Sequence, residues 1–254
     1  MKTIAIANNK GGCGKTATTY YLGKLLAEMG LSTLLVDLDP QANLTEALPL
    51  DDAPTKTIAD VLGGAAPESG LDSAIWPVAG PHLLWLCPSE FQLANTALGL
   101  LNDAVKGRTA LRRALRQAPP YIQCVLIDCP PEAGILLANA LFAADGVILP
   151  AEPEEAAFAG VRRVVEMADY IRSDRESETP AVLGMIATRI DSRTTRHQDG
   201  IEQMERSSAP LLGVVRERNG ANRERELPNE YRPIAEQLAL WIREGSYARS
   251  AQNE

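Results

Sequence analysis

The chain has 254 residues, carries a net charge of −8 and is 45% hydrophobic. A chain of this length and composition can bury a substantial core, so disorder is excluded as the dominant state. It contains no uninterrupted apolar run of about 18 residues, which excludes a membrane-spanning helix. The four cysteines form no CxxC pair and have no histidine close by, so we expect free thiols, a reducing cytoplasm and no structural zinc.

Short apolar segments alternate with stretches in which apolar residues recur every three or four positions. The short segments predict strands at Thr3–Ala7, Thr33–Asp37, Leu83–Cys87, Cys124–Asp128, Gly146–Pro150, Val182–Thr188 and Leu211–Val215. The helical pattern is clear at Tyr20–Met29, Ile135–Ala143, Ala159–Ile171 and Tyr231–Ile242. Nearly all-apolar strands separated by helices indicate a parallel sheet that is covered on both faces.

We therefore expect one doubly wound α/β domain over residues 1–254, with an ordered core to about residue 244 and a short polar tail. Residues 51–80 are rich in Pro, Gly and Ala and predict an excursion within this domain. The segment Arg108–Arg116 predicts the basic face of a helix that precedes the fourth strand.

A glycine-rich loop, Lys10-Gly11-Gly12-Cys13-Gly14-Lys15-Thr16, follows the first predicted strand and leads directly into a helical pattern. Successive backbone N–H groups in such a turn can surround a phosphate, and the helix N-terminus adds partial positive charge. Lys15 can then reach the β- and γ-phosphates of a nucleotide, and the Thr16 hydroxyl can ligate magnesium. The spacing departs from G-x-x-x-x-G-K-[ST], because Asn9 stands at its first glycine and Lys10 is an additional lysine.

This loop resembles the deviant Walker A motif, KGGxGKT, of the ParA/MinD family of ATPases. Val36–Asn43 is similar to the family's DxDPQxN segment, and Val125–Pro131 to its Walker B strand with the following D-[CT]-P-P. Gly184–Thr194 resembles the G-x-x-x-T-x-x-D-x-R-T stretch of ParA proteins. The resemblance spans residues 1–243, is weak over residues 50–120, and is closest to the small, Soj-like ParA ATPases. It implies a P-loop NTPase fold with ATP and Mg²⁺.

The resemblance also implies roles for single residues. Lys10 would cross a dimer interface to the partner's nucleotide, which would make the nucleotide-bound dimer the active state. Asp39 would orient the attacking water and complete a catalytic set with Lys10 and Lys15. The nucleotide contacts would be Lys10, Gly11, Gly12, Cys13, Gly14, Lys15, Thr16, Ala17, Thr188 and the loop around Pro228. Magnesium would be supported by Thr16, Asp37 and Asp128. For each aspartate the alternative is that a strand-ending Asp caps the next turn.

Two loop residues depart from the family pattern. Ala17 stands where most relatives carry a threonine whose hydroxyl would contact the α-phosphate. One lost hydrogen bond costs on the order of 1 kcal/mol, so we expect weaker nucleotide affinity but not loss of binding. Cys13 replaces the common valine, and we expect a tolerated small side chain. The alternative is a regulatory thiol made acidic by the nearby lysine and helix N-terminus.

Positive charge is concentrated late in the chain. Residues 189–232 contain nine arginines and eight acidic residues, a local balance of +1 against −9 for the rest. In ParA relatives, arginines of the D-x-R-T stretch and of the loop before the position of Pro228 bind DNA without sequence preference. The candidates by resemblance and position are Arg193, Arg196, Arg216, Arg218, Arg223 and Arg225. The alternative is a solvated loop with local salt bridges, because Glu217, Glu224 and Glu226 lie among these arginines.

The resemblance predicts a cytoplasmic, nucleoid-associated ATPase that forms an ATP-bound homodimer, binds DNA non-specifically and positions a cargo. The cargo would be a plasmid, a chromosome locus or a protein assembly such as a carboxysome, and a ParB-like partner would stimulate hydrolysis. We expect no separate DNA-reading domain ahead of the first strand.

Three other classes of ATPase are weighed against this prediction. A MinD-like membrane-cycling ATPase needs an apolar and basic C-terminal helix, which Arg243–Glu254 does not provide, so we expect no membrane partner. A redox ATPase like the nitrogenase iron protein needs cluster-ligating cysteines in other contexts than those of Cys124 and Cys129. An ATP-dependent biosynthetic ligase or amidase needs a substrate pocket, which the sequence does not locate.

Overall fold

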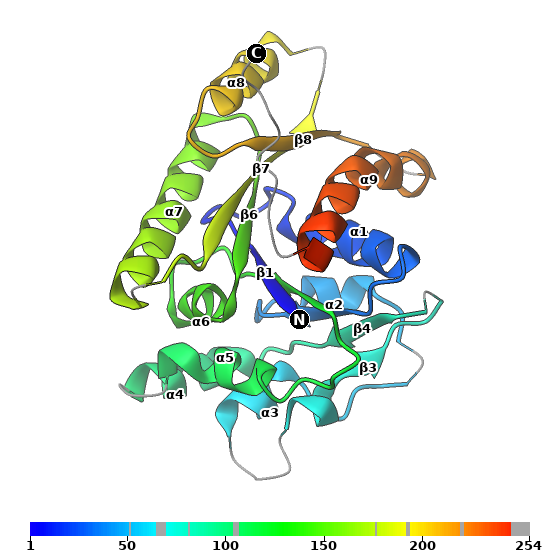
Figure 1. Ribbon diagram of the computed structural model, residues 1–254, viewed down its shortest axis with the longest axis vertical. Coiled ribbons are helices and arrows are strands. Elements are labelled where there is room, and N and C mark those ends of the chain that lie inside the picture. The colour runs from blue at the N-terminus through cyan, green and yellow to red at the C-terminus, as the bar shows by residue number, and fades with distance from the viewer. Residues whose placement is uncertain are drawn as a thin grey trace.

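The computed structural model describes residues 1–50, 52–64, 70–80, 82–103, 107–175, 177–191, 194–218 and 221–244, with residues 175 and 221–225 described by their backbone alone. Within these residues, eight strands form one sheet in the order β3-β4-β2-β5-β1-β6-β7-β8 (Figure 1). The strands are β1 (Lys2–Ile6), β2 (Thr33–Asp37), β3 (Trp76–Pro77), β4 (Leu84–Cys87), β5 (Cys124–Asp128), β6 (Gly146–Ala151), β7 (Ala181–Ile190) and β8 (Leu211–Arg216). Neighbouring strands are parallel except for the antiparallel pair β3–β4. The predicted doubly wound, mostly parallel sheet is confirmed.

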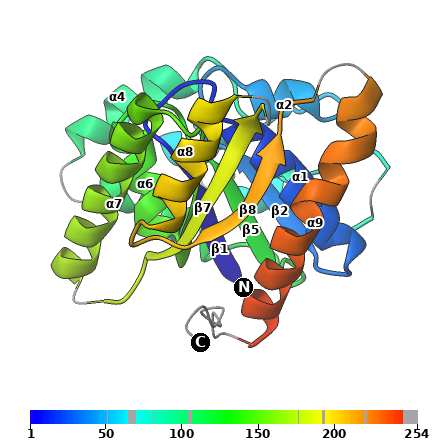
Figure 2. The same ribbon diagram turned by 90° about the horizontal axis from the view of Figure 1, so that it is seen from above.

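Helices cover both faces of this sheet (Figure 2). On one face, α1 (Lys15–Glu28) packs against α9 (Ala221–Glu244), and their apolar residues meet Ile4 and Ile6 of β1. Ala5 of β1 points to the opposite face because side chains alternate along a strand. The core on that opposite face is built from α3 (Ile58–Gly63), α4 (Leu93–Asn102), α5 (Ala110–Leu115), α6 (Ile135–Ala143) and α7 (Glu155–Arg175). The remaining α-helices of the described residues are α2 (Asn43–Ala47) and α8 (Thr195–Glu205).

The predicted strands are all present, and their ends differ from the prediction by at most two residues. The predicted basic helix before β5 is also present, as α5 and a short 3₁₀ turn at Gly107–Thr109. The excursion at residues 51–80 holds more structure than the sequence predicted, namely α3, a 3₁₀ turn at Leu71–Ala74 and the edge strand β3. These elements have two to six residues each, which is too short for a hydrophobic period to show in the sequence.

Helix α9 contains the clearest departure from the predicted elements. The sequence predicts a loop around Pro228, but Pro228 and Pro233 both lie inside α9, so this prediction is wrong. A proline removes one helical hydrogen bond, and packing against α1 and β8 outweighs that loss. The residues that pack recur every three or four positions: Leu227, Tyr231, Ile234, Leu238 and Trp241. In the part of the chain that the structure describes, α9 included, no helix combines the length and apolarity needed to cross a membrane.

Candidate active site

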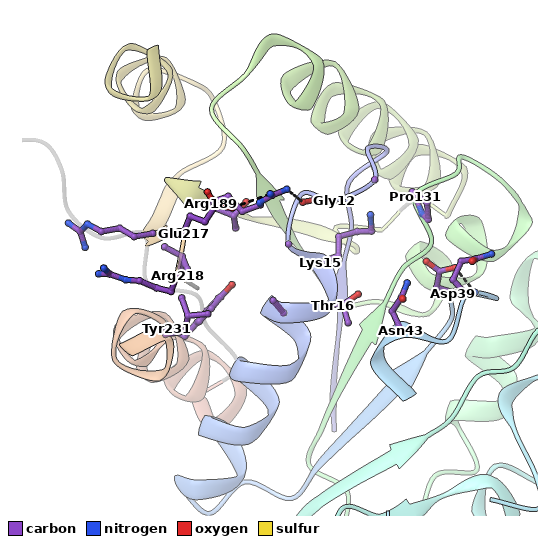
Figure 3. A pocket seen from close by; sticks show the side chains of 18 residues that line it. Gly12, Lys15, Thr16, Asp39, Asn43, Pro131, Arg189, Glu217, Arg218 and Tyr231 are labelled. Carbon is purple, nitrogen blue, oxygen red and sulfur yellow. Dashed lines mark hydrogen bonds and ion pairs between the residues drawn. The ribbon is translucent and has the colours of Figure 1, made fainter. Parts of the chain in front are cut away.

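A cleft of about 580 Å³ lies at the carboxyl ends of the parallel strands (Figure 3). Ligand sites of open α/β sheets form at this edge, because the loops that follow the strands converge there. The glycine-rich loop and the first turn of α1 form its floor. One wall comes from the segments after β2 and β5, with Asp39, Asn43 and Pro131. The opposite wall comes from the ends of β7 and β8 and from α9, with Arg189 and Tyr231.

The glycine-rich loop requires glycine at two positions. Gly12 and Gly14 have φ angles of 74° and 87°, in the left-handed region that disfavours other residues. A Cβ atom on Gly14 would also come within 3.3 Å of the Thr188 side chain. Two hydrogen bonds tie this loop to the end of β7. Thr188 Oγ1 donates to the carbonyl of Cys13 (2.8 Å), and Arg189 Nη1 donates to the carbonyl of Gly12 (3.2 Å).

The two lysines of the loop point in different directions. Lys15 is buried, lines the cleft and donates through Nζ to the backbone carbonyl of Lys10 (2.9 Å). Lys10 Nζ instead lies 2.9 Å from Glu152 Oε2 and 3.5 Å from Glu154 Oε2, on the segment after β6. The loop therefore directs one ammonium group into its own cleft and the other to the segment between β6 and α7.

Two buried carboxyl groups lie below the cleft, on the neighbouring strands β2 and β5. Asp37 and Asp128 are paired in register, and both side chains are removed from solvent. Burial, reinforced by the charge of Asp37, raises the pKa of Asp128 to about 8, although a hydrogen bond with Thr16 opposes this rise. Burial likewise raises the pKa of Asp37 to about 6, against hydrogen bonds from Thr45. A cation near these carboxyl groups would favour their charged forms.

This donor set fits magnesium. Mg²⁺ is commonly held by one or two carboxylates together with phosphate oxygens and water, as Asp128 and the Thr16 hydroxyl allow. Among the described residues no group of three His, Cys, Asp or Glu side chains could hold a metal ion alone. Asp37 also has the turn-capping role that the sequence left open, because its Oδ2 accepts from Thr45 N (2.9 Å) and Thr45 Oγ1 (2.8 Å).

Asp39 lines the cleft on a segment that three hydrogen bonds hold in place. Its backbone N–H donates to Asp37 Oδ1 (3.2 Å), and its Oδ1 accepts from the N–H of Gln41 (3.0 Å). Its carbonyl accepts a hydrogen bond from Ser89 Oγ (2.7 Å), a residue that follows β4. Sequence reasoning missed Ser89, because only the fold brings the segment after β4 beside the segment after β2.

Apolar residues line the cleft beside α9. These residues are Val215, Leu227 and Tyr231. Leu227 and Tyr231 lie on either side of Pro228 along the chain. The Tyr231 hydroxyl lies 3.0 Å from Thr18 Oγ1 of α1, and its ring stacks on Tyr21. Thr188 also lines the cleft, and Ala17 lines it from the first turn of α1. The helical period of α9 was a signal for Leu227 and Tyr231, but it indicated packing and not a site.

The predicted DNA-binding arginines occupy several elements instead of one set of loops. Arg196 lies on α8 and is largely exposed, with Nη1 3.8 Å from Glu154 Oε1. Arg216 and Arg218 line the cleft, and both pair with Glu230 of α9, at 3.3 Å and 3.0 Å. Arg193 lies outside the described residues, as do the side chains of Arg223 and Arg225, whose backbone belongs to α9. The local salt bridges left open by the sequence are therefore present at Arg216 and Arg218.

Cys13 is fully buried in the loop. Burial raises the pKa of its thiol, which outweighs the opposing effect of Lys15. The alternative of an unusually acidic thiol at this position is wrong, and a tolerated small side chain agrees with the structure.

Comparisons with known proteins agree with this geometry. A family model described as "AAA domain" matches residues 1–179. Sporulation initiation inhibitor protein Soj of Bacillus subtilis is 32% identical over 206 residues, which cover 81% of this chain and 79% of Soj. The chromosome-partitioning ATPase Soj of Thermus thermophilus is 36% identical over 194 residues, which cover 76% of this chain and 72% of that protein.

Among solved structures, cobyrinic acid a,c-diamide synthase from Mycobacterium smegmatis, with bound ATP analog and magnesium, matches with a TM-score of 0.84. It is 31% identical, and the match covers 97% of this chain and 98% of that one. The family model and the Soj relatives each cover most of the chain, and the loop and sheet described above have the expected form. The chain belongs to the ParA/MinD family of ATPases.

Proposed function

We propose that this protein binds ATP with magnesium, dimerises in that state, binds nucleoid DNA without sequence preference and positions or segregates a cargo. A ParB-like partner stimulates hydrolysis and so ends the DNA-bound state. The family membership, the Soj relative named as a chromosome-partitioning ATPase and the cleft at the carboxyl edge of the sheet support this proposal.

In this proposal the cleft holds the nucleotide. The N–H groups of the loop and the Lys15 ammonium bind the phosphates, which the left-handed glycines Gly12 and Gly14 allow to approach the backbone. Thr16 and Asp128 hold magnesium, which neutralises charge on the phosphates. Asp39 orients the attacking water. Leu227 and Tyr231 form an apolar surface for the base, with Thr188 at the loop.

The proposed dimer is supported by the different directions in which the two loop lysines point. Lys15 already supplies a cation to its own cleft, whereas Lys10 Nζ points away to Glu152 and Glu154. In the proposed dimer Lys10 leaves these partners and serves the other subunit's nucleotide, because charge that develops in phosphoryl transfer is stabilised by additional cations.

The DNA part of the proposal rests on charge and on symmetry. The chain is acidic overall, so a single copy has little attraction for a polyanion. A two-fold dimer presents two copies of each late arginine, and arginine forks suit phosphate oxygens. Arg196 is the candidate most accessible in the described part of this region, with its side chain 69% exposed.

The test is a DNA titration of the wild-type protein with ATP, with ADP and without nucleotide, at two salt concentrations. We expect binding with ATP alone, no preference between DNA sequences and a steep fall with salt, since each neutralised phosphate releases counterions. Arg223→Glu should weaken DNA binding and leave ATP-dependent dimerisation intact. Wild-type protein that ignores DNA in every nucleotide state would remove DNA from the proposal.

The similarity to a protein named as a diamide synthase favours one other candidate, an ATP-dependent amide-forming ligase. Such an enzyme hydrolyses ATP in step with a carboxylic acid substrate and an ammonia source. The two candidates separate in one ATPase assay, with cobyrinic acid and glutamine in one arm and DNA in the other. Stimulation by cobyrinic acid and glutamine with amide product would replace the DNA-positioning proposal by the ligase.

A further inference from the structure

A chain of alternating charges runs beside the phosphate-binding loop. Glu152 stands at its centre, because its Oε2 lies 2.9 Å from Lys10 Nζ and its Oε1 lies 2.8 Å from Arg189 Nη1. Arg189 Nη2 also forms an ion pair with Glu217 (3.1 Å). Glu154, the second partner of Lys10, forms an ion pair with Arg196 (3.8 Å). We call this set the Lys10 network; its members are Lys10, Glu152, Glu154, Arg189, Arg196 and Glu217.

Glu152 is the least exposed member of the Lys10 network. Its side chain is 15% exposed, against 25% for Lys10 and 50% for Arg189, so its pair with Lys10 is less screened than the outer pairs. Its backbone is also fixed. Glu152 follows directly on β6. The next residue, Pro153, packs closely against α8, because a Cβ atom on Gly200 of α8 would lie 2.6 Å from the Pro153 carbonyl oxygen. Lys10 is therefore paired with a firmly held carboxylate.

Arg189 sets the orientation of this carboxylate. It adopts a left-handed backbone conformation (φ 55°), which is unfavourable for a non-glycine residue and persists where surrounding contacts hold it. In that conformation its guanidinium extends along the phosphate-binding loop and donates to the Gly12 carbonyl (Figure 3). The same guanidinium forms an ion pair with Oε1 of Glu152. The other oxygen of Glu152 is then directed at Lys10.

The proposed dimer requires Lys10 to leave these partners, because its ammonium must reach the nucleotide of the other subunit. We propose that Glu152, oriented by Arg189, is a positioning residue that retains Lys10 within its own subunit and thereby sets the protein concentration at which the ATP-bound dimer forms. This inference rests on the proposed function for its second half. The retention of Lys10 by Glu152 concerns the single chain and is tested without a dimer.

The size of the effect follows from the two-fold symmetry of a dimer. The apparent association constant equals the intrinsic constant multiplied by the fraction of molecules in the competent state. Both subunits must release Lys10, so the association constant of the dimer depends on the square of that fraction. If Glu152→Gln raises the released fraction about threefold, the dissociation constant of the ATP-bound dimer falls about ninefold. Glu154→Gln should have a smaller effect, about two- to threefold, because Glu154 lies 3.5 Å from Lys10 and not 2.9 Å.

The first measurement is the reactivity of Lys10 without nucleotide. Trace acylation of the intact protein, read by mass spectrometry, compares Lys10 with Lys24 and Lys56 in the same sample. Burial lowers the pKa of Lys10, but the hydrogen bonds and charges of Glu152 and Glu154 together outweigh this effect, so the pKa is raised and the ammonium form is favoured. We expect Lys10 to react severalfold faster in Glu152→Gln and somewhat faster in Glu154→Gln. Glu202→Gln, which removes the same charge from an exposed pair with Arg206, is the matched control.

The second measurement is sedimentation velocity over a range of protein concentrations at saturating ATP. We expect half-dimerisation at about tenfold lower concentration in Glu152→Gln, less change in Glu154→Gln and none in Glu202→Gln. Unchanged Lys10 reactivity in both Glu152→Gln and Glu154→Gln overturns the retention of Lys10. Raised reactivity with an unchanged dimer threshold overturns the role in dimerisation.

The two proposals fail in distinguishable ways. If Lys10 becomes more reactive in the variants but neither they nor the wild type dimerise with ATP, retention of Lys10 is supported and the proposed dimer is wrong. If Glu152→Gln does not fold, as judged by its circular dichroism and thermal melt, the graded difference between Glu154→Gln and Glu202→Gln decides the same question.

Discussion

The two walls of the cleft are built by different physical means. The wall after β2 and β5 depends on Asp37 and Asp128, which are buried, paired in register and hydrogen-bonded to backbone or threonine groups. The wall at β7, β8 and α9 depends on ion pairs of half-exposed arginines, such as Arg189 with Glu217 and Arg216 with Glu230. Buried polar groups tolerate little displacement, whereas exposed pairs exchange partners at small cost. We infer that the first wall and the floor carry the chemistry, and that the second wall adjusts to ligands and partners.

The largest expected effect lies on the floor of the cleft, at Lys15. Lys15→Ala removes a buried ammonium that lies beside the loop carbonyls, and we expect nucleotide affinity to fall by about 100-fold or more. Isothermal titration with ATP and magnesium measures this change. Lys56→Ala, at an exposed lysine paired with Asp60, is the control and should bind as wild type does. Wild-type affinity in Lys15→Ala would mean that nucleotide binds elsewhere.

The next effect concerns turnover at the first wall. Asp39→Ala should still bind ATP and dimerise, but hydrolyse it roughly 100-fold more slowly, because the group that orients the attacking water is lost. A steady-state phosphate-release assay, with nucleotide affinity measured on the same preparation, separates the two properties. Ser89→Ala removes the hydrogen bond to the Asp39 carbonyl and should slow turnover less. Normal turnover in Asp39→Ala contradicts its assigned role.

A smaller effect is expected at the second wall. Glu230→Gln weakens the pairs with Arg216 and Arg218 but keeps an acceptor for the backbone N–H of Arg216. We expect it to cost roughly 1–2 kcal/mol of unfolding free energy, which lowers the melting temperature by about 2–8 °C. Nucleotide affinity should change only a few-fold. If Glu230→Gln lost nucleotide binding as completely as Lys15→Ala, the contrast between the two walls would not hold.

The smallest effect is a gain at the floor. Ala17→Thr supplies the hydroxyl that the family pattern places near the α-phosphate, and one hydrogen bond of about 1 kcal/mol raises nucleotide affinity about fivefold. Ala17→Val is the matched control, since it has the same shape without the hydroxyl. Equal affinities of the two variants would show that no phosphate contact is available at this position.

The contrast between the walls also explains what the sequence could predict. The strand patterns of β2 and β5 and the motifs that contain Asp37 and Asp128 could be predicted, because each lies within one short segment of the chain. The residues missed, Ser89, Arg189 and Tyr231, act through partners 50, 177 and 213 residues away in the chain. Pro228 was predicted in a loop because local propensity favours a turn there, while tertiary packing of α9 decides the outcome.

The hydrogen bond between Tyr231 and Thr18 provides a fixed point on α1 about which α9 can rotate. Thr18 lies in the first turn of α1, directly after the glycine-rich loop, so the bond joins α9 to the part of α1 next to that loop. Tyr231 stands ten residues from the start of α9, which corresponds to an arm of about 15 Å at a rise of about 1.5 Å per residue. A rotation of about 5° about this pivot therefore moves the end of the arm by roughly 1.3 Å. A displacement too small to disturb the loop itself is thus enlarged where α9 begins, at the turn of the helix that carries Arg223 and Arg225.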